Sequence, residues 1–163
     1  MHPATDITWL KVECEKATSF EELVVVALGE LKKFKDGAEL VCGPITTGGQ
    51  GSVEANLAVF NKVIDHFVRV DRPIFSQMPY EGKIFLLRRE WINKDPNRAN
   101  EYYHGILERF YLPLIESGLI RTAWFIEGWE SSVGAKWEHK QLRMVGAHLR
   151  YLNNLHLASI LEE

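Results

Sequence analysis

Short apolar runs alternate with longer segments of helical periodicity along most of this 163-residue chain, and this alternation limits the folds open to it. Apolar runs bounded by turn residues predict buried strands at 38–42, 73–75, 120–126 and 148–152. The spacing of apolar side chains predicts helices between them, at 52–69, 79–97, 100–118 and 133–145. Such an order builds a mostly parallel sheet with helices on both faces.

The first 37 residues precede the first predicted strand. Ser19 and Glu22 form a capping box, and apolar side chains then recur at roughly helical spacing up to Gly37, a residue type that commonly ends a helix. We therefore expect an N-terminal helical extension at 1–37, followed by an α/β domain at 38–163.

Charge and hydropathy limit the partners. The chain has 19 Lys and Arg residues and 22 Asp and Glu residues. The resulting net charge of −3 provides no overall positive field for a nucleic-acid backbone. The longest apolar run, 23–28, is far shorter than the ~20 residues that span a bilayer. The N-terminus lacks the pattern of a signal peptide. We expect a cytoplasmic protein with no nucleic-acid polymer and no membrane among its partners.

The residues that bind metals are few and scattered. Cys14 and Cys42 are too few for a disulfide framework or a thiolate zinc site, and they are more simply read as reduced thiols. No spacing that forces a shared metal is found among the histidines His66, His104, His139 and His148. We expect neither a metal nor a cofactor.

Ligands of open α/β sheets bind beyond the carboxyl ends of the strands, so the segments 43–51, 76–80 and 128–138 should converge. Gly134 opens a helix there, and the N–H groups of its first turn could bind an anion. Two readings stay open for Ser132. Its hydroxyl only caps this helix, or it joins the amides of Gly134 and Ala135 in holding a phosphate.

Glu138 lies about one and a half turns inside the same helix. The helix dipole and nearby N–H groups favour an ionised carboxylate at this position, and an ionised carboxylate is a nucleophile. The alternative is an ordinary exposed glutamate that pairs with Lys136 or Gln141, and spacing alone favours that alternative.

The segment 128–138, GWESSVGAKWE, resembles the signature of the nucleoside 2-deoxyribosyltransferase-like superfamily, in which a small-residue turn precedes a helix that bears a nucleophilic glutamate. The run Cys42-Gly43-Pro44-Ile45 and the Gly/Thr loop after it resemble the first strand and substrate loop of that family. The run Ile74-Phe75-Ser76-Gln77 resembles the end of its second strand. The resemblance covers roughly 39–152. With the alternation of strands and helices, it predicts a single-domain Rossmann-like or flavodoxin-like fold.

The resemblance implies that Glu138 attacks the anomeric carbon of a nucleoside or nucleotide. Ser132, with Gly134 and Ala135, would meet the 5′ end. The residue that matches Ser132 is a carboxylate in the transferase branch and a serine in the branch that hydrolyses nucleoside 5′-monophosphates. A carboxylate about 4 Å from a phosphate costs several kcal/mol, so serine permits the phosphate. The base or sugar would be surrounded by Gly43, Pro44, Ile45 and Gln77.

The resemblance further implies a homo-oligomer, because family members complete their sites with a residue from a neighbouring chain. The expected function is therefore an N-glycosyl hydrolase or transferase that acts on a small-molecule nucleotide or nucleoside. The alternative is a catalytically inactive nucleotide-binding module of the same fold.

One departure from the family concerns Pro113, which occupies the place of an aspartate that helps to handle the departing base. Glycosyl hydrolysis normally uses two carboxyl groups, and Glu108 and Glu116 of the same predicted helix are the candidates to substitute. Pro113 should also kink that helix. Four aromatic side chains could either stack on a base or only pack against other side chains: Tyr80, Tyr102, Tyr103 and Trp129. Five basic side chains could either form a solvated helix face or steer an anionic substrate: Lys83, Arg88, Arg89, Lys94 and Arg98.

Overall fold

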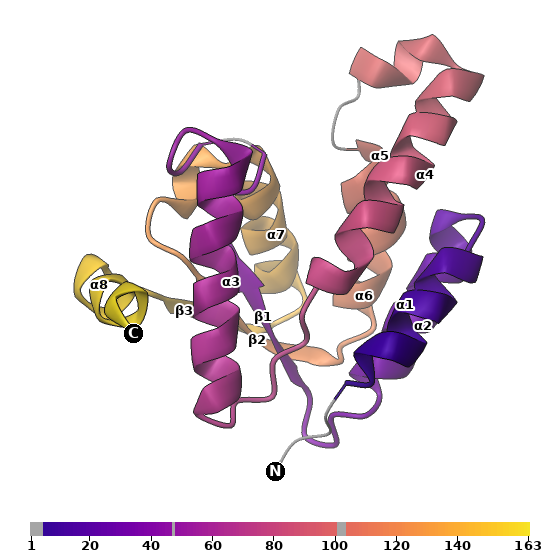
Figure 1. Ribbon diagram of the computed structural model, residues 1–163. Helices are drawn as coiled ribbons and strands as arrows, with labels where there is room; N and C mark the ends of the chain where they lie inside the picture. Colours follow the sequence, from indigo (N-terminus) through magenta and orange to yellow (C-terminus); the bar gives the residue numbers. More distant parts are fainter. Residues whose placement is uncertain (1–4, 47, 101–103) are drawn as a thin grey trace.

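The computed structural model describes residues 5–46, 48–100 and 104–163 as a mixed α/β structure (Figure 1). Its sheet is parallel and has the strand order β1-β2-β3, formed by β1 (Ala38–Cys42), β2 (Ile120–Phe125) and β3 (His148–Tyr151). Cys42 pairs with Phe125, which in turn pairs with Tyr151. The carboxyl ends of all three strands therefore lie at one edge of the sheet.

The strand predicted at 73–75 is present only as an isolated bridge between Ile74 and Glu39 of β1. Glu39 donates to the Pro73 carbonyl and accepts from the Phe75 amide, at 2.8 and 2.9 Å. Pro73 has no N–H to extend this ladder, and the chain soon enters the 3₁₀ turn Met78–Tyr80. The prediction of a full strand was therefore wrong, although the segment lies beside β1.

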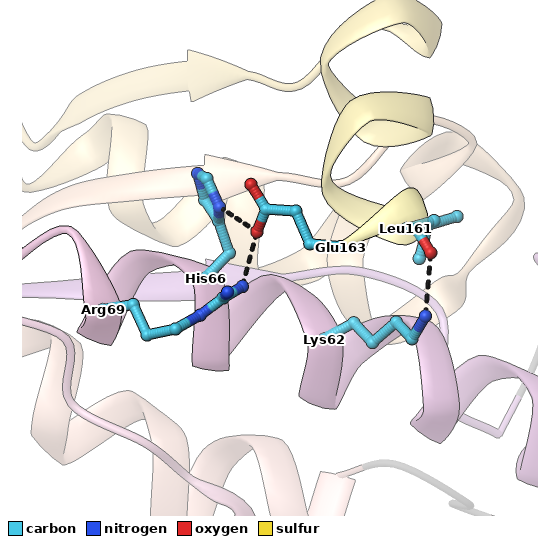
Figure 2. A network of polar contacts seen from close by, with 5 residues as sticks. All are labelled: Lys62, His66, Arg69, Leu161 and Glu163. Carbon is cyan, nitrogen blue, oxygen red and sulfur yellow. Dashed lines mark hydrogen bonds and ion pairs between the residues drawn. The ribbon is translucent and has the colours of Figure 1, made fainter.

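Side chains of β1 alternate between two cores, as the two-residue period of a strand requires. Val41 belongs to the smaller core, with side chains of α3 (Val53–Arg69) and α8 (Asn154–Glu162). Figure 1 shows both helices on one side of the strands. Polar contacts also join them, because Lys62, His66 and Arg69 of α3 bind the Leu161 carbonyl and the Glu163 carboxylate (Figure 2).

Leu40 and Cys42 belong to the larger core on the other face. That core includes side chains of α1 (Ile7–Lys16), α2 (Phe20–Leu31), α4 (Glu81–Lys94), α6 (Leu112–Glu116) and α7 (Val133–Met144). Helices thus cover both faces of the sheet, as expected. Within the described ranges, no helix has the length and apolar character needed to cross a bilayer.

The N-terminal region differs from its prediction as one helix. Ser19 caps α2 as expected, by accepting from the Glu22 amide at 3.1 Å, but α2 ends at Leu31. Gly37, with φ of 92°, lies in the turn that leads into β1. A second helix, α1, precedes α2 and buries Leu10 in the same core as Leu40. The prediction missed α1 because only two of its side chains are buried.

The helix predicted at 100–118 is not one continuous α-helix. A π-helical turn at Leu107–Tyr111 separates α5 (His104–Ile106) from α6, and the Leu112 amide donates to the Leu107 carbonyl. Pro113 therefore lies in the first turn of α6, where its missing N–H removes no α-helical hydrogen bond.

Candidate functional site

A pocket opens at the carboxyl edge of the sheet. Its walls come from the loop after β1, from the residue before the 3₁₀ turn Met78–Tyr80, from the π-helical turn, and from α3, α4 and α7. The three segments expected to converge therefore do meet here. The lining residues that the resemblance singled out are Gly43, Ile45, Gln77, Ser132, Gly134, Ala135 and Glu138.

Pro44 is the one proposed substrate-binding residue that lies outside this pocket. It lines a separate small hollow with Gly49 and Asn56. Because successive residues of an extended chain face opposite sides, Gly43 and Ile45 line the pocket while Pro44 is directed away from it. The assignment of Pro44 to the substrate is therefore wrong for this pocket.

Asn56 of α3 holds the loop after β1 in place. Its side-chain nitrogen donates to the carbonyls of Ile45 and Gly48, at 3.0 and 3.1 Å, and its oxygen accepts from the Gln50 amide at 2.7 Å. The hydroxyl of Ser131 accepts from the Gly49 amide at 2.9 Å. The loop is thus fixed to both α3 and the segment before α7.

Ser132 caps α7, and its hydroxyl accepts from the Ala135 amide at 3.2 Å. The capping interpretation is correct, and this bond occupies the Ala135 amide that was expected to meet a phosphate. Gly134 has open space, because a Cβ there would meet only the Ser132 hydroxyl, at 3.9 Å. A ligand could therefore approach the first turn of α7 at Gly134.

Gln77 presents a hydrogen-bond acceptor without a partner. Its side chain is only 2% exposed, and its Nε2 donates to the Val41 carbonyl at 2.8 Å. Its Oε1 is buried and has no hydrogen-bond partner among the described residues. An unmet buried acceptor in a pocket wall is suited to a donor group on a ligand.

Glu138 is buried, with 8% of its surface exposed, and it lines the pocket. Burial raises its pKa to about 8, the Cys42 thiol opposes this rise by hydrogen bonding, and the charge of Glu81 adds to it. The expectation of an ionised side chain is therefore wrong for the ligand-free protein at neutral pH. Desolvation exceeds any effect of the helix dipole at this depth. The alternative of an exposed glutamate is also wrong.

Glu81 is a second carboxyl group in the same pocket, and the sequence analysis missed it. It begins α4, is partly buried, and accepts a hydrogen bond from the Tyr111 hydroxyl at 3.0 Å. Burial raises the pKa of Glu81, and this hydrogen bond opposes the rise. Its position directly after the segment 76–80, expected to reach the site, was the available signal. The candidates Glu108 and Glu116 are both exposed and lie outside the pocket.

The aromatic candidates pack rather than line the pocket. Tyr80 is fully buried, with ring centroids 5.6 Å from those of Phe75 and Phe110. Trp129 stacks on His139, with centroids 4.4 Å apart. Tyr102 and Tyr103 lie outside the described residues.

Among the five basic candidates, only Arg88 lines the pocket. Lys83, for example, donates to the Glu15 carbonyl at 2.9 Å on the surface.

Within the described ranges, no three His, Cys, Asp or Glu side chains are grouped so that they could hold a metal ion. Comparisons with protein-family models, with curated proteins and with solved structures find no match for this chain.

Proposed function

We propose that this protein cleaves the N-glycosyl bond of a nucleoside or nucleotide, by hydrolysis or by transfer of the sugar, with Glu138 as the nucleophile. The observation that carries the proposal is the buried carboxyl group of Glu138, which lines one pocket with Gly134 of α7 and with Gln77. A nucleophilic glutamate needs such neighbours, because other groups must hold the substrate while it reaches the anomeric carbon.

The pocket suits a substrate of this class. We assign the 5′ hydroxyl or phosphate to Ser132 and Gly134, where the positive end of the α7 dipole lies. Gln77 Oε1 would accept from a sugar hydroxyl or a base N–H. Arg88 adds a positive charge for an anionic substrate.

Glu138 must be ionised when it attacks. The hydrogen bond from the Cys42 thiol favours the ionised form. In the bound complex, positive charge develops at the anomeric carbon as the bond to the base breaks, and this charge also favours a carboxylate. The substrate would therefore remove part of the penalty that burial imposes on the charged form.

We also propose a flavodoxin-like or Rossmann-like arrangement of the sheet. Glu39 pairs with Thr122 on one side and with Ile74 on the other. If the Ile74 segment is counted as the second strand, the spatial order is second, first, third and fourth. Flavodoxin-like sheets begin with this order, and their ligand lies at the point where the order reverses.

The assembly and the compartment belong to the same proposal. We propose a homo-oligomer, as the resemblance implies, and a cytoplasmic location, where the buried free thiols Cys14 and Cys42 would stay reduced. Light scattering tests the assembly, and a single species of 18.7 kDa at working concentration would contradict it.

A nucleotide-binding module without turnover is the second candidate. Two features favour it: burial raises the pKa of Glu138 to about 8, and the resemblance matches Pro113 to an aspartate. Such a module would keep the pocket and bind the same ligands.

Release of free base distinguishes the two functions. The purified protein is incubated with a panel of ribonucleosides, deoxyribonucleosides and their 5′-monophosphates, and the products are separated by chromatography. The enzyme should liberate base from at least one substrate, and Glu138→Gln should liberate none. Binding of a nucleotide without release from any substrate would refute the enzyme and support the binding module.

A further inference from the structure

We propose that Glu81 is the second catalytic carboxyl group, which protonates the departing base and then takes a proton from the water that releases the sugar. This inference rests on the proposed function. It concerns the protonation of the departing base. The resemblance implies an aspartate for this step, and this chain has Pro113 at the matching position. Glu81 comes instead from the start of α4.

The geometry places Glu81 where such an acid is needed. Glu81 and Glu138 line one pocket from two different helices, α4 and α7. The Tyr111 hydroxyl donates to Glu81 Oε1 at 3.0 Å and so fixes the orientation of the carboxyl group. Tyr111 is itself buried at the end of the π-helical turn, a feature that is frequent at functional sites.

The pocket wall next to Glu81 suits a base. Phe85 lies one turn further along α4, and Leu107 lies one turn before Tyr111; both line the pocket, as does Ile106. An aromatic base packs favourably against such an apolar wall. The base would thus face α4, while the 5′ end of the sugar lies at the start of α7.

The two carboxyl groups interact electrostatically. The negative charge of Glu81 adds to the burial that raises the pKa of Glu138. The other ionisable groups that face them are the Cys42 thiol from β1, the Tyr111 hydroxyl and Arg88 of α4. Two carboxyl groups that interact in this way titrate as a coupled pair. In the ligand-free protein burial favours the proton on Glu138. The proposed step needs it on Glu81, and the positive charge that develops at the anomeric carbon favours this shift.

The chemical steps balance with these two groups alone. Ionised Glu138 forms a bond to the anomeric carbon while the bond to the base nitrogen breaks. The electron pair of that bond goes to the base, which takes the proton from Glu81. A water molecule then attacks the same carbon, the bond to Glu138 breaks, and Glu81 takes the proton of the water. The sugar leaves, and both carboxyl groups return to their starting state.

The test compares leaving groups in Glu81→Gln. An ordinary purine needs a proton as it departs, whereas an N7-methylated purine already carries a positive charge and departs without one. We expect Glu81→Gln to lower the rate of base release in the first turnover about 100-fold or more on the ordinary purine and less than about 10-fold on the methylated one. Glu138→Gln should lose activity on both. Glu116→Gln, an exposed carboxylate on α6, is the matched control and should retain both activities.

The pH profile adds a readout that a merely structural role would not change. In the wild type, kcat on the ordinary purine should fall above about pH 8, where the pair loses its last proton. The residual activity of Glu81→Gln should lack this alkaline limb. Tyr111→Phe, which loses only the positioning hydrogen bond, should lower kcat by about 10-fold and keep the limb.

The outcomes separate this inference from the proposed function. Equal losses in first-turnover base release on both purines, or an unchanged pH profile in Glu81→Gln, would overturn the role of Glu81 while base release by the wild type stands. A wild-type protein that releases no base from any substrate would overturn both. Circular dichroism of each variant shows whether the loss comes from unfolding.

Discussion

Replacing Glu138 with Gln should make the protein increasingly more stable than the wild type as pH rises from about 5 to 8, while it removes the proposed activity. The folded protein holds the Glu138 proton up to a pKa of about 8, against an ordinary value of 4.5. Between these two pH values the folded state therefore binds more protons than the unfolded state. The free energy of unfolding of the wild type must fall as pH rises through this window. Gln has no proton to lose there and nearly the same size.

The magnitude follows from the pKa. A difference of about 3.5 in pKa corresponds to about 5 kcal/mol of stability, which is present below pH 4.5 and lost by pH 8. The titration of Glu138 is coupled to that of Glu81. Replacing Glu138 alone should therefore change only part of these 5 kcal/mol. We expect Glu138→Gln to gain about 2–4 kcal/mol on the wild type between pH 5 and pH 8.

Urea denaturation at pH 5, 6, 7 and 8 measures this difference, with far-ultraviolet circular dichroism as the signal. The curves of wild type and Glu138→Gln should diverge as pH rises, while those of wild type and the exposed Glu116→Gln should stay parallel. Parallel curves for wild type and Glu138→Gln would refute the reasoning, because the Glu138 carboxyl would then have no raised pKa in the folded state.

Three further predictions concern the pocket. Glu138→Gln should lower kcat for base release at least ~10³-fold, about 4 kcal/mol of lost transition-state stabilisation, as measured by steady-state kinetics on a protein shown to be folded; full activity would exclude Glu138 as the nucleophile. Ser132→Asp keeps a helix cap but sets a negative charge against a 5′-phosphate, so kcat/KM should fall for 5′-monophosphates and not for unphosphorylated nucleosides; equal losses would exclude the phosphate role. Asn56→Ala should lower the free energy of unfolding by about 1–3 kcal/mol and raise KM, because the carbonyls of Ile45 and Gly48 lose their donor; an unchanged KM would show that the loop does not position substrate.

Local signals predicted the elements that depend on local chemistry. Ser19 was predicted as a cap from its spacing to Glu22, and capping was one of the two interpretations of Ser132; each accepts the expected amide. The strand β2 was found from its apolar run between turns, although it ends one residue earlier than predicted. The helix α8 was missed, yet its cap is equally local, because Asn153 accepts from the His156 amide at 2.9 Å.

Tertiary packing decided what local signals could not. Glu81 is an ordinary first-turn glutamate in the sequence, and only the meeting of α4 with the π-helical turn buries it beside Tyr111. The pKa of Glu138 was misjudged for the same reason, since the helix dipole is visible in the sequence but the depth of burial is not. Periodicity along the helix axis carries no information about which neighbouring element covers a side chain.

Pro113 lies next to the turn that buries Glu81 beside Tyr111. In the sequence Pro113 predicts a kink in the helix, and the resemblance matches it to an aspartate. In the structure it lies at the start of α6, directly after the π-helical turn that ends in Tyr111. A proline cannot donate to the carbonyl four residues earlier, so it is compatible with a widened turn at this point. That turn places the Tyr111 hydroxyl against Glu81. We therefore infer that Pro113 is part of the local structure that orients Glu81.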